Sequence, residues 1–202
     1  MTSEPLDPRS QGTPLEELTA LDQAIFDAIA DTPTPALDRW VVRLSDAANY
    51  SRLWMGVAAA LAVVGGRRGR RAAATGLLAV GVTSAVTNLG LKPLADRRRP
   101  VHSDGDAVPD SRRVRRPEST SFPSGHSASA FAFASAAGSA WPTISLPLHA
   151  AAAMVGYSRV HTGVHYPSDV AAGAFVGGVC GKAVGRLTRS VTTGPLAGGP
   201  TP

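Results

Sequence analysis

The residues best suited to chemistry lie in one short stretch, Ser158 to Asp169, which reads Ser-Arg-Val-His-Thr-Gly-Val-His-Tyr-Pro-Ser-Asp. The stretch holds an arginine, two histidines and an aspartate, and an apolar segment flanks it on each side. Ionisable groups beside membrane-type apolar runs are costly to desolvate, and they therefore indicate a functional site. We expect His165 to act as a nucleophile, Asp169 to orient its ring and Arg159 to bind an anionic substrate.

Two earlier stretches carry groups that suit the same chemistry. Lys92 to Pro100 reads Lys-Pro-Leu-Ala-Asp-Arg-Arg-Arg-Pro and ends in the pair Arg99-Pro100. Residues 123–126 read Pro-Ser-Gly-His at the predicted start of a helix, where free backbone N–H groups and the helix dipole bind anions. Arginine offers phosphate a planar fork and lysine a compact charge. The three stretches together favour transfer of a phosphoryl group.

Phosphoryl transfer requires charge neutralisation in the transition state, a nucleophile and a proton donor for the leaving oxygen. The cationic groups expected to neutralise the charge are Lys92, Arg99 and Arg159. We assign the role of nucleophile to His165 and the role of proton donor to His126. A neutral imidazole attacks through one nitrogen only while the other keeps its proton, and a carboxylate that accepts this N–H fixes the tautomer. Asp169, four residues after His165, suits that role.

The elements that must hold these groups are predicted to be helices in a membrane. Of the 202 residues, 44% are hydrophobic and only 17% are charged, and most of the apolar content is alanine, valine and glycine. This composition is typical of small, closely packed helices. Ala72 to Leu91 is uncharged over twenty residues. As a helix this segment spans about 30 Å, the thickness of a bilayer core.

Further apolar runs extend the predicted bundle to about five transmembrane spans. These runs cover 53–66, 126–141, 143–157 and 170–187, with a break at Pro142. The small residues on these segments permit close helix contact, and they include Ala128, Ala130, Ala134, Gly138, Gly173, Gly177 and Gly181. We therefore predict an all-α, multi-span transmembrane helical bundle, with a soluble helical bundle as the alternative.

Two amphipathic helices are expected before the first span. The first starts at Pro14, with apolar residues three and four apart, and the second covers 35–49. We expect a single membrane domain over 14–189, divided into amphipathic helices at 14–50 and a transmembrane core at 51–189. The tails 1–13 and 190–202 are expected to be disordered. The first fourteen residues lack the pattern of a cleaved signal peptide, and the single Cys180 is expected to be a small core residue.

Basic residues predict how the bundle is oriented. Five spans place one group of them on the face opposite the predicted site: Arg67, Arg68, Arg70, Arg71, Lys182, Arg186 and Arg189. The positive-inside rule assigns that face to the cytoplasm, and the site then faces the extracytoplasmic side of the cell membrane. The loop 92–125 opposes this orientation, because it carries eight basic residues of its own. The orientation therefore requires some of these charges to serve the site.

The order and spacing of the three motifs resemble a known family. The pattern Lys92-x6-Arg99-Pro100, then Pro-Ser-Gly-His at 123–126, then Ser-Arg-x5-His-x3-Asp at 158–169 is similar to the signature of the type 2 phosphatidic acid phosphatases, which are related to vanadium-dependent haloperoxidases. The resemblance covers roughly residues 36 to 187. Residues 51–54 and 67–71 also resemble actinobacterial proteins that fuse such a phosphatase to a diacylglycerol kinase domain. The resemblance concerns only the phosphatase part of those proteins, so only the phosphatase function is expected here.

The resemblance implies a membrane phosphatase that acts on lipid phosphates or polyprenyl (pyro)phosphates without a metal or other cofactor. It implies that Lys92, Arg99 and Arg159 bind phosphate, and that Ser124 and the Gly125 amide assist. It further implies a phosphohistidine at His165, oriented by Asp169, and protonation of the leaving alcohol by His126. The expected partners are the lipid phosphate substrate and membrane lipids, and not nucleic acid.

Three other functions fit part of the pattern. A vanadate-dependent haloperoxidase uses a similar anion cage, and a non-catalytic lipid-phosphate binder could use the same pocket. Nucleic-acid binding through the arginine-rich 97–116 loop is disfavoured because aromatic residues are not interleaved with the arginines.

Charged and aromatic residues outside the motifs are expected to have simpler roles. We expect Arg97 and Arg98 to be solvated or to contact headgroups, and the surface charges to include Arg112, Arg113, Arg115 and Arg116. His161 is expected at the pocket rim and His149 as a satisfied buried histidine. Trp40 and Trp54 are expected as anchors at the membrane interface.

Overall fold

The computed structural model describes residues 13–101, 108–116 and 118–193, and seven α-helices make up most of this part of the chain. They are α1 (Pro14–Asp31), α2 (Pro35–Ala47), α3 (Arg52–Val64), α4 (Gly66–Ala85), α5 (Gly125–Ala140), α6 (Ser145–His161) and α7 (Pro167–Thr193). The described residues contain no β-strand, which confirms the all-α class. The tails predicted at 1–13 and 190–202 lie outside the described residues, except for Thr13 and the end of α7.

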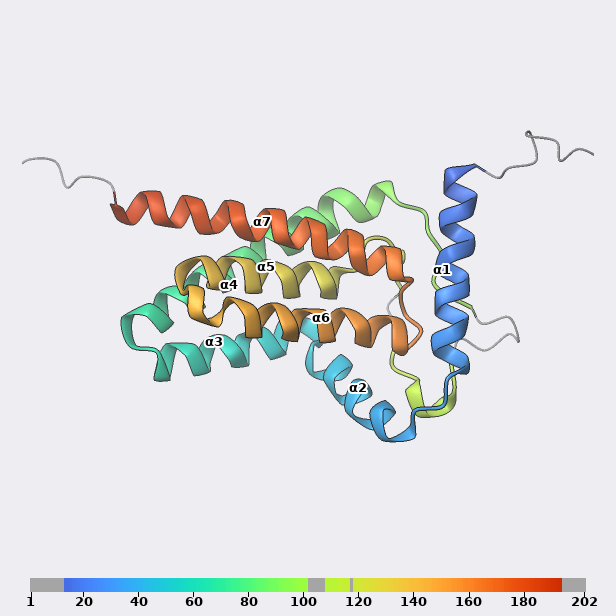
Figure 1. Ribbon diagram of the computed structural model, residues 1–202. Coiled ribbons are helices and arrows are strands. Elements are labelled where there is room, and N and C mark those ends of the chain that lie inside the picture. The colour runs from blue at the N-terminus through green and yellow to red at the C-terminus, as the bar shows by residue number, and fades with distance from the viewer. Residues whose placement is uncertain (1–12, 102–107, 117, 194–202) are drawn as a thin grey trace, which may run out of the picture.

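The helices α3 to α7 run alongside one another, and α1 stands across one end of this bundle (Figure 1). Helix α5 is central, because it packs against α4, α6 and α7. Helix α2 runs obliquely from the end of α1 towards the start of α3 (Figure 1). One end of the bundle is therefore covered by the two N-terminal helices, and the opposite end carries the short turns after α3 and α5.

Glycines on α7 allow it to lie directly on α5. A Cβ atom at Gly177 would fall 2.1 Å from the backbone oxygen of Ala128, and one at Gly173 would fall 2.4 Å from that of Ser124. Both separations are far below van der Waals contact. The close contact predicted from the small residues is thus confirmed, and it fixes the start of α7 against the start of α5.

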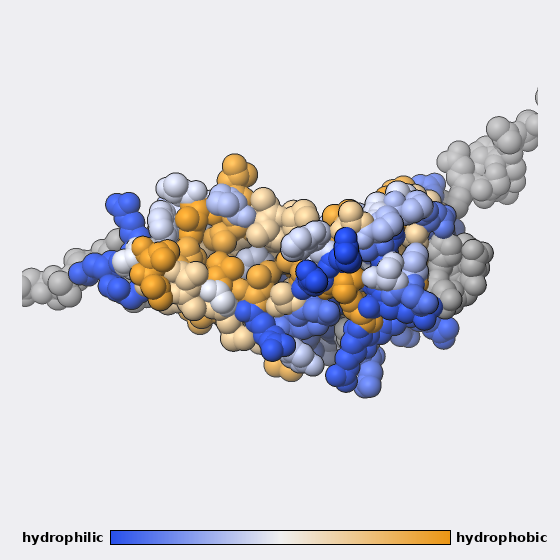
Figure 2. Space-filling model, turned by 90° about the horizontal axis from the view of Figure 1, so that it is seen from below, coloured by the Kyte–Doolittle hydropathy of each residue, from blue (hydrophilic) through white to orange (hydrophobic). Residues whose placement is uncertain are grey.

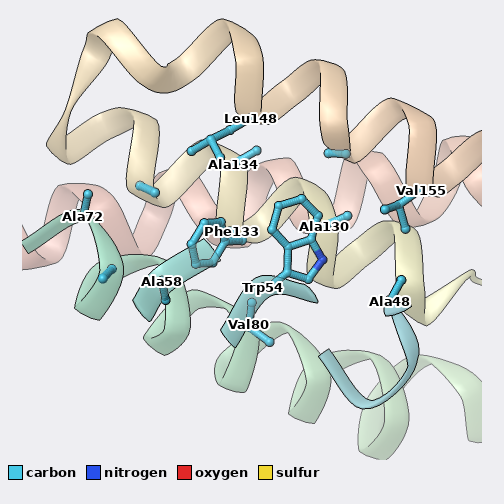
Figure 3. Close-up of a cluster of buried hydrophobic side chains, with 13 residues drawn as sticks. Ala48, Trp54, Ala58, Ala72, Val80, Ala130, Phe133, Ala134, Leu148 and Val155 are labelled. Carbon is cyan, nitrogen blue, oxygen red and sulfur yellow. The ribbon is translucent and has the colours of Figure 1, made fainter. Parts of the chain in front are cut away.

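An aromatic pair fills the core between α3 and α5 (Figure 3). The rings of Trp54 and Phe133 have centroids 5.1 Å apart, and alanines surround them on α3, α4 and α5. The Trp54 side chain is only 1% exposed. The prediction of Trp54 as an interface anchor is therefore wrong, because its ring packs on Phe133 inside the bundle, whereas Trp40 is exposed as expected.

The start of α4 differs from expectation, whereas the break between α5 and α6 does not. The arginines of 67–71 were expected in a loop, but α4 begins at Gly66, so they form its first turns. The chain reverses at Gly65 and Gly66 instead, and Gly66 has a φ of +55°, which favours glycine. The break at Pro142 is confirmed by a 3₁₀ turn, Pro142–Ile144, between α5 and α6. At its other end α4 continues as a π-helical turn, Val86–Leu91, towards Lys92.

Apolar side chains cover the middle of the bundle, and hydrophilic ones gather at its ends (Figure 2). In the described residues, two helical segments are long and apolar enough to cross a membrane, Gly66–Leu94 and Pro167–Ser190. Helices α3, α5 and α6 have 13, 16 and 17 residues, which corresponds to only about 20–26 Å. The five-span count is therefore not confirmed.

Candidate active site

All eight predicted site residues meet at the end of the bundle that α1 and α2 cover. Lys92 follows α4, Arg99 lies in the extended segment after it, and residues 124–126 start α5. Arg159 is in the last turn of α6, His165 in the turn that follows, and Asp169 in the first turn of α7. The motifs converge because α4, α5, α6 and α7 each begin or end at this face.

His165 is buried, with its two ring nitrogens facing opposite charges. Nδ1 lies 3.5 Å from Oδ2 of Asp169, somewhat long for a hydrogen bond, and Nε2 lies 3.4 Å from a guanidinium nitrogen of Arg99. Burial lowers the pKa of His165 to about 4; the nearby carboxylate of Asp169 acts in the opposite direction, and the charge of Arg99 adds to the lowering. The imidazole is therefore neutral at pH 7, with Nε2 available on the cationic side.

Asp169 is fully buried, and donors surround its carboxylate. Oδ2 accepts hydrogen bonds from the Ser121 hydroxyl and from the backbone N–H of Tyr166, the latter at 2.9 Å. Oδ1 accepts one from Arg97, also at 2.9 Å. These contacts fix the plane of the carboxylate and leave it ionised opposite Nδ1 of His165.

Two arginine side chains, Arg99 and Arg159, act on the buried ring of His165. Arg99 donates to the backbone oxygens of Val164 at 2.6 Å and Ser119 at 2.9 Å, which fixes its guanidinium. Burial lowers the pKa of Arg99, Asp169 opposes the shift, and Arg116 adds to it. Arg159 donates to the Ser45 hydroxyl, and its buried Nε has no partner. Positive charges that repel one another in a buried site are suited to an anion.

Lys92 and the start of α5 complete the cationic side of the site. Nζ of Lys92 donates to the Ser119 hydroxyl at 3.1 Å, and it lies 3.8 Å from the position that a Cβ on Gly125 would occupy. The Ser124 hydroxyl caps α5 by accepting from the Ser127 N–H at 3.4 Å. The lysine therefore lies beside the start of α5, and a cation next to a helix N-terminus suits an anion site.

His126 is held by a residue that the sequence analysis did not select. Its Nε2 lies 3.0 Å from the side-chain oxygen of Asn49, which follows α2. His126 also lies within the electrostatic influence of Arg159, His165, Lys92 and Arg99, so it belongs to the same group of charged side chains as the nucleophile. Asn49 and Ser45 show that the end of α2 is part of the site wall.

Arg97 does not have the role that the sequence suggested. Instead of a solvated charge, it is an ion-pair partner of Asp169 at 2.9 Å and of Asp22 on α1 at 2.6 Å. Asp22 also accepts from the backbone N–H of Ser168 at 2.9 Å and so caps α7. Arg98 is exposed as expected. Nothing in three successive arginines distinguishes the buried one, because its partners lie far away in the sequence.

Two further predictions are wrong because of one buried network. Arg112, expected on the surface, is 1% exposed and pairs with Asp38 of α2 at 2.9 Å. His161, expected at the pocket rim, is buried and lies 2.9 Å from the same carboxylate. Arg112 also donates to the backbone oxygen of Ile29 at 2.8 Å, near the end of α1. The network joins α1, α2 and α6 beside the site and does not reach the phosphate-binding groups.

The other predictions for isolated residues agree with the structure, except that Cys180, expected in the core, is only partly buried. Arg113, Arg115 and Arg116 are exposed, and His149 is satisfied by Ser135 and by the backbone oxygen of Ser145 at 2.8 Å. Cys180 is a free cysteine of intermediate exposure. Among the described residues, no group of three or more His, Cys, Asp or Glu side chains is arranged to hold a metal ion.

Comparison with known proteins agrees with this arrangement. A family model described as the PAP2 superfamily matches residues 72–191, more than half of the chain. A stretch of 58 residues is 47% identical to the lipid A 1-phosphatase of Rhizobium etli. That match covers 29% of this chain and 25% of the relative, so it spans about a quarter of the relative's length.

Two solved structures share the fold. LpxE of Aquifex aeolicus matches with a TM-score of 0.64 and 26% identity, over 81% of this chain and 94% of that one. A transmembrane PAP2-type phosphatidylglycerolphosphate phosphatase from Bacillus subtilis matches with a TM-score of 0.65 and 23% identity, over 89% of this chain and 90% of that one. These matches span almost the whole described bundle, so the likeness is one of complete architecture.

Proposed function

The chain belongs to the PAP2 superfamily, and from this membership we propose that it is an integral-membrane phosphatase that hydrolyses lipid phosphate or polyprenyl (pyro)phosphate monoesters. The observation that carries the proposal is the buried His165 between a fixed carboxylate and the two arginines Arg99 and Arg159. The names of the relatives, a lipid A 1-phosphatase and a phosphatidylglycerolphosphate phosphatase, support a phosphate carried by a lipid. We propose that the reaction needs no metal, because the cations of the chain itself can neutralise the phosphate.

In the first step, Nε2 of His165 attacks phosphorus while the bond from phosphorus to the alcohol oxygen breaks. Lys92, Arg99 and Arg159 neutralise the phosphate oxygens, and the Ser124 hydroxyl and the Gly125 N–H assist them. Burial and the neighbouring cations favour neutral His126 in the free site, so we propose that His126 takes up a proton when the anionic phosphate binds. It then gives this proton to the departing oxygen, and the alcohol leaves neutral. Asp169 stabilises the positive charge that develops on His165 and keeps its proton on Nδ1.

In the second step, water attacks the phosphorus of the phosphohistidine and the bond from phosphorus to Nε2 breaks. His126, now neutral, accepts a proton from that water and is protonated again. Inorganic phosphate leaves, and His165 is again neutral. The two histidines therefore have complementary roles, one covalent and one as acid and base.

We place the site on the extracytoplasmic face of the cell membrane. The chain enters α4 through the arginines of 67–71 at the end of the bundle opposite the site, which suits a cytoplasmic location. The eight basic residues of 92–125 are a weaker argument against this orientation than the sequence suggested, because several of them have partners or a role in the site. Lys92 and Arg99 line the site, and Arg97 and Arg112 are in ion pairs with carboxylates.

The decisive experiment is phosphate release from lipid phosphates by the purified chain, comparing wild type with His165→Ala. We expect the variant to lose at least about a thousandfold in kcat, because removal of a nucleophile leaves only binding and charge effects. His149→Ala is the matched control, since this histidine is also partly buried but remote from the site. Substantial turnover by His165→Ala would refute the mechanism, and lipid binding without any release would indicate a non-catalytic binder.

A further inference from the structure

A polar cavity of about 210 Å³ lies beside His126, between α5, the end of α4 and the turn after α2. Its lining includes Lys92, Gly125 and His126 from the proposed active site, but not Arg99, Arg159 or His165. The remaining polar lining comes from residues to which no role has been given: Ser84, Thr87, Asn88 and Ser129, with Tyr50 and Ser51 on the opposite side. The cavity therefore adjoins the proton donor and not the nucleophile.

One wall of the cavity holds a hydroxyl group without a partner. Thr87 is 1% exposed, lines the cavity, and its Oγ1 makes no hydrogen bond. Ser84 and Ser129 face each other at 3.5 Å, the limit of a hydrogen bond. Burying a hydroxyl without a partner is unfavourable by about 1–3 kcal/mol. Hydrogen-bonding groups in this cavity are thus available to a ligand that carries hydroxyls or other polar atoms.

The backbone on two sides of the cavity is irregular. Thr87 and Asn88 lie in the π-helical turn Val86–Leu91, and such turns occur mostly at functional sites. On the opposite side, Tyr50 and Ser51 have φ values of 54° and 58°, in the left-handed region that is unfavourable for both residue types. Strained backbone of this kind clusters at ligand-binding sites. The cavity therefore lies between two irregular backbone segments, the π-helical turn and the turn after α2, and not between regularly packed helices.

The position of the cavity indicates which part of a substrate it receives. Under the proposed function, on which this inference rests, His126 protonates the oxygen of the leaving alcohol. The carbon attached to that oxygen must then lie next to His126, where the cavity begins. The volume of about 210 Å³ equals roughly seven water molecules, which suits a glycerol unit or part of a sugar ring.

We propose that this cavity binds the hydroxyl-bearing carbons of the leaving group, so the enzyme prefers phosphates carried by glycerol or a sugar over phosphates carried directly by a hydrocarbon chain. A hydroxylated leaving group supplies partners to Thr87, Asn88 and the two serines. A plain hydrocarbon leaves these groups unpaired, and sites that bind a hydroxyl discriminate strongly against analogues without one.

The test compares two single-chain substrates, palmitoyl lysophosphatidate, whose leaving group is a hydroxylated glycerol, and hexadecyl phosphate, whose leaving group is a bare chain. Wild type should show the higher kcat/KM on lysophosphatidate. In Thr87→Val and in Asn88→Leu, the ratio of the two kcat/KM values should fall, by about tenfold in the double variant. Thr83→Val is the matched control, because Thr83 is also buried without a hydrogen bond one turn earlier, outside the cavity lining.

A second measurement separates this inference from the proposed function. Glycerol 1-phosphate should raise the Tm of the wild-type protein more than propyl phosphate does, and the difference should disappear in the double variant. If phosphate is released from both lipids with a ratio that Thr87→Val and Asn88→Leu do not change, the cavity proposal is wrong and the phosphatase stands. If no lipid is hydrolysed but the difference in Tm is present, the phosphatase is wrong and the cavity stands.

Discussion

At the scale of single residues, the central feature is a chain of charges that runs from α1 to His165. Asp22 binds Arg97, Arg97 binds Asp169, and Asp169 faces Nδ1 of the histidine. Of these three contacts, only the one between Asp169 and His165 joins two residues of the sequence motifs. Because Arg97 touches neither the histidine nor the phosphate-binding cations, we regard it as a positioning residue for the carboxylate.

Replacing Arg97 by methionine should reduce kcat about tenfold and leave KM nearly unchanged. The reason is that Asp169 would lose one of the donors that fix its plane, whereas the phosphate-binding residues would stay in place. Initial rates on a lipid phosphate in mixed micelles measure both constants. Arg98→Met serves as the control, since Arg98 is exposed and adjacent. A purely structural role for Arg97 would instead lower Tm with no selective effect on kcat.

The titration of His165 provides a second prediction at this scale. Burial lowers its pKa to about 4, so the ring should stay neutral as the pH falls through 6.5, where an ordinary histidine becomes charged. The chain has five histidines, and NMR of protein labelled with ¹³C in the histidine rings can follow each one. The resonance absent from His165→Gln should have its midpoint well below pH 6. A midpoint near 6.5 would mean that the ring is not buried as described.

At the scale of elements, α7 determines where Asp169 lies. The helix contacts α5 through glycines, and Asp22 of α1 caps its first turn. The backbone N–H of Ser124 also donates to the backbone oxygen of Asp169 at 3.0 Å, which ties the start of α5 to the start of α7. The geometry between the phosphate-binding turn and the nucleophile therefore depends on how closely α5 and α7 pack.

Replacing Gly177 by alanine should destabilise the protein by about 1–3 kcal/mol, the usual cost of overpacking. The new methyl group would lie 2.1 Å from a backbone oxygen of α5, so the helices must separate. Gly178→Ala is the matched control, because no atom lies within 4 Å of its Cβ position. Thermal unfolding in detergent compares the two variants. Equal Tm values would contradict the described contact between α5 and α7.

Helices α1 and α2 were expected to be amphipathic helices beside the membrane core, and they have a second role at the site. Residues near the end of α2 contact Arg159 and His126, and Asp38 of α2 joins Arg112 and His161 in a buried network. The aspartate is largely sequestered from water, which is tolerable because both partners donate to it. Residues 13–50 are therefore integrated with the site.

At the scale of the whole molecule, the distribution of charge relates the site to the membrane. Apolar side chains cover the middle of the bundle, and the site lies at one hydrophilic end (Figure 2). Arginines at the start of α4 occupy the opposite end. A lipid could therefore keep its chain beside the apolar surface while its phosphate enters the site from the membrane edge.

The orientation can be tested with single cysteines in a Cys180→Ser background, using a maleimide that does not cross membranes. We expect Glu118→Cys, near the site, to react in intact cells. Arg67→Cys, at the other end, should react only after the cells are made permeable. Both positions are exposed, so accessibility alone does not separate them. The reverse labelling pattern would place the site on the cytoplasmic face.

The sequence by itself determined the helical class, the approximate helix positions and the eight motif residues. These features depend on local spacing: apolar runs form helices, and residues such as His165 and Asp169 are one helical turn apart. The phosphohistidine role assigned to this pair stays a prediction until turnover is measured. The sequence could also indicate that α5 and α7 would approach closely, because glycine lacks the Cβ that would keep them apart.

Only the tertiary structure decided which charges are buried. Arg97 and Arg98 are neighbours of the same type, yet only Arg97 meets Asp169, 72 residues away in the sequence. The same holds for Arg112 with Asp38, and for Asn49 with His126, 77 residues apart. Such contacts depend on how helices pack against one another. No local pattern encodes them, so the roles of these residues became apparent only once the bundle was assembled.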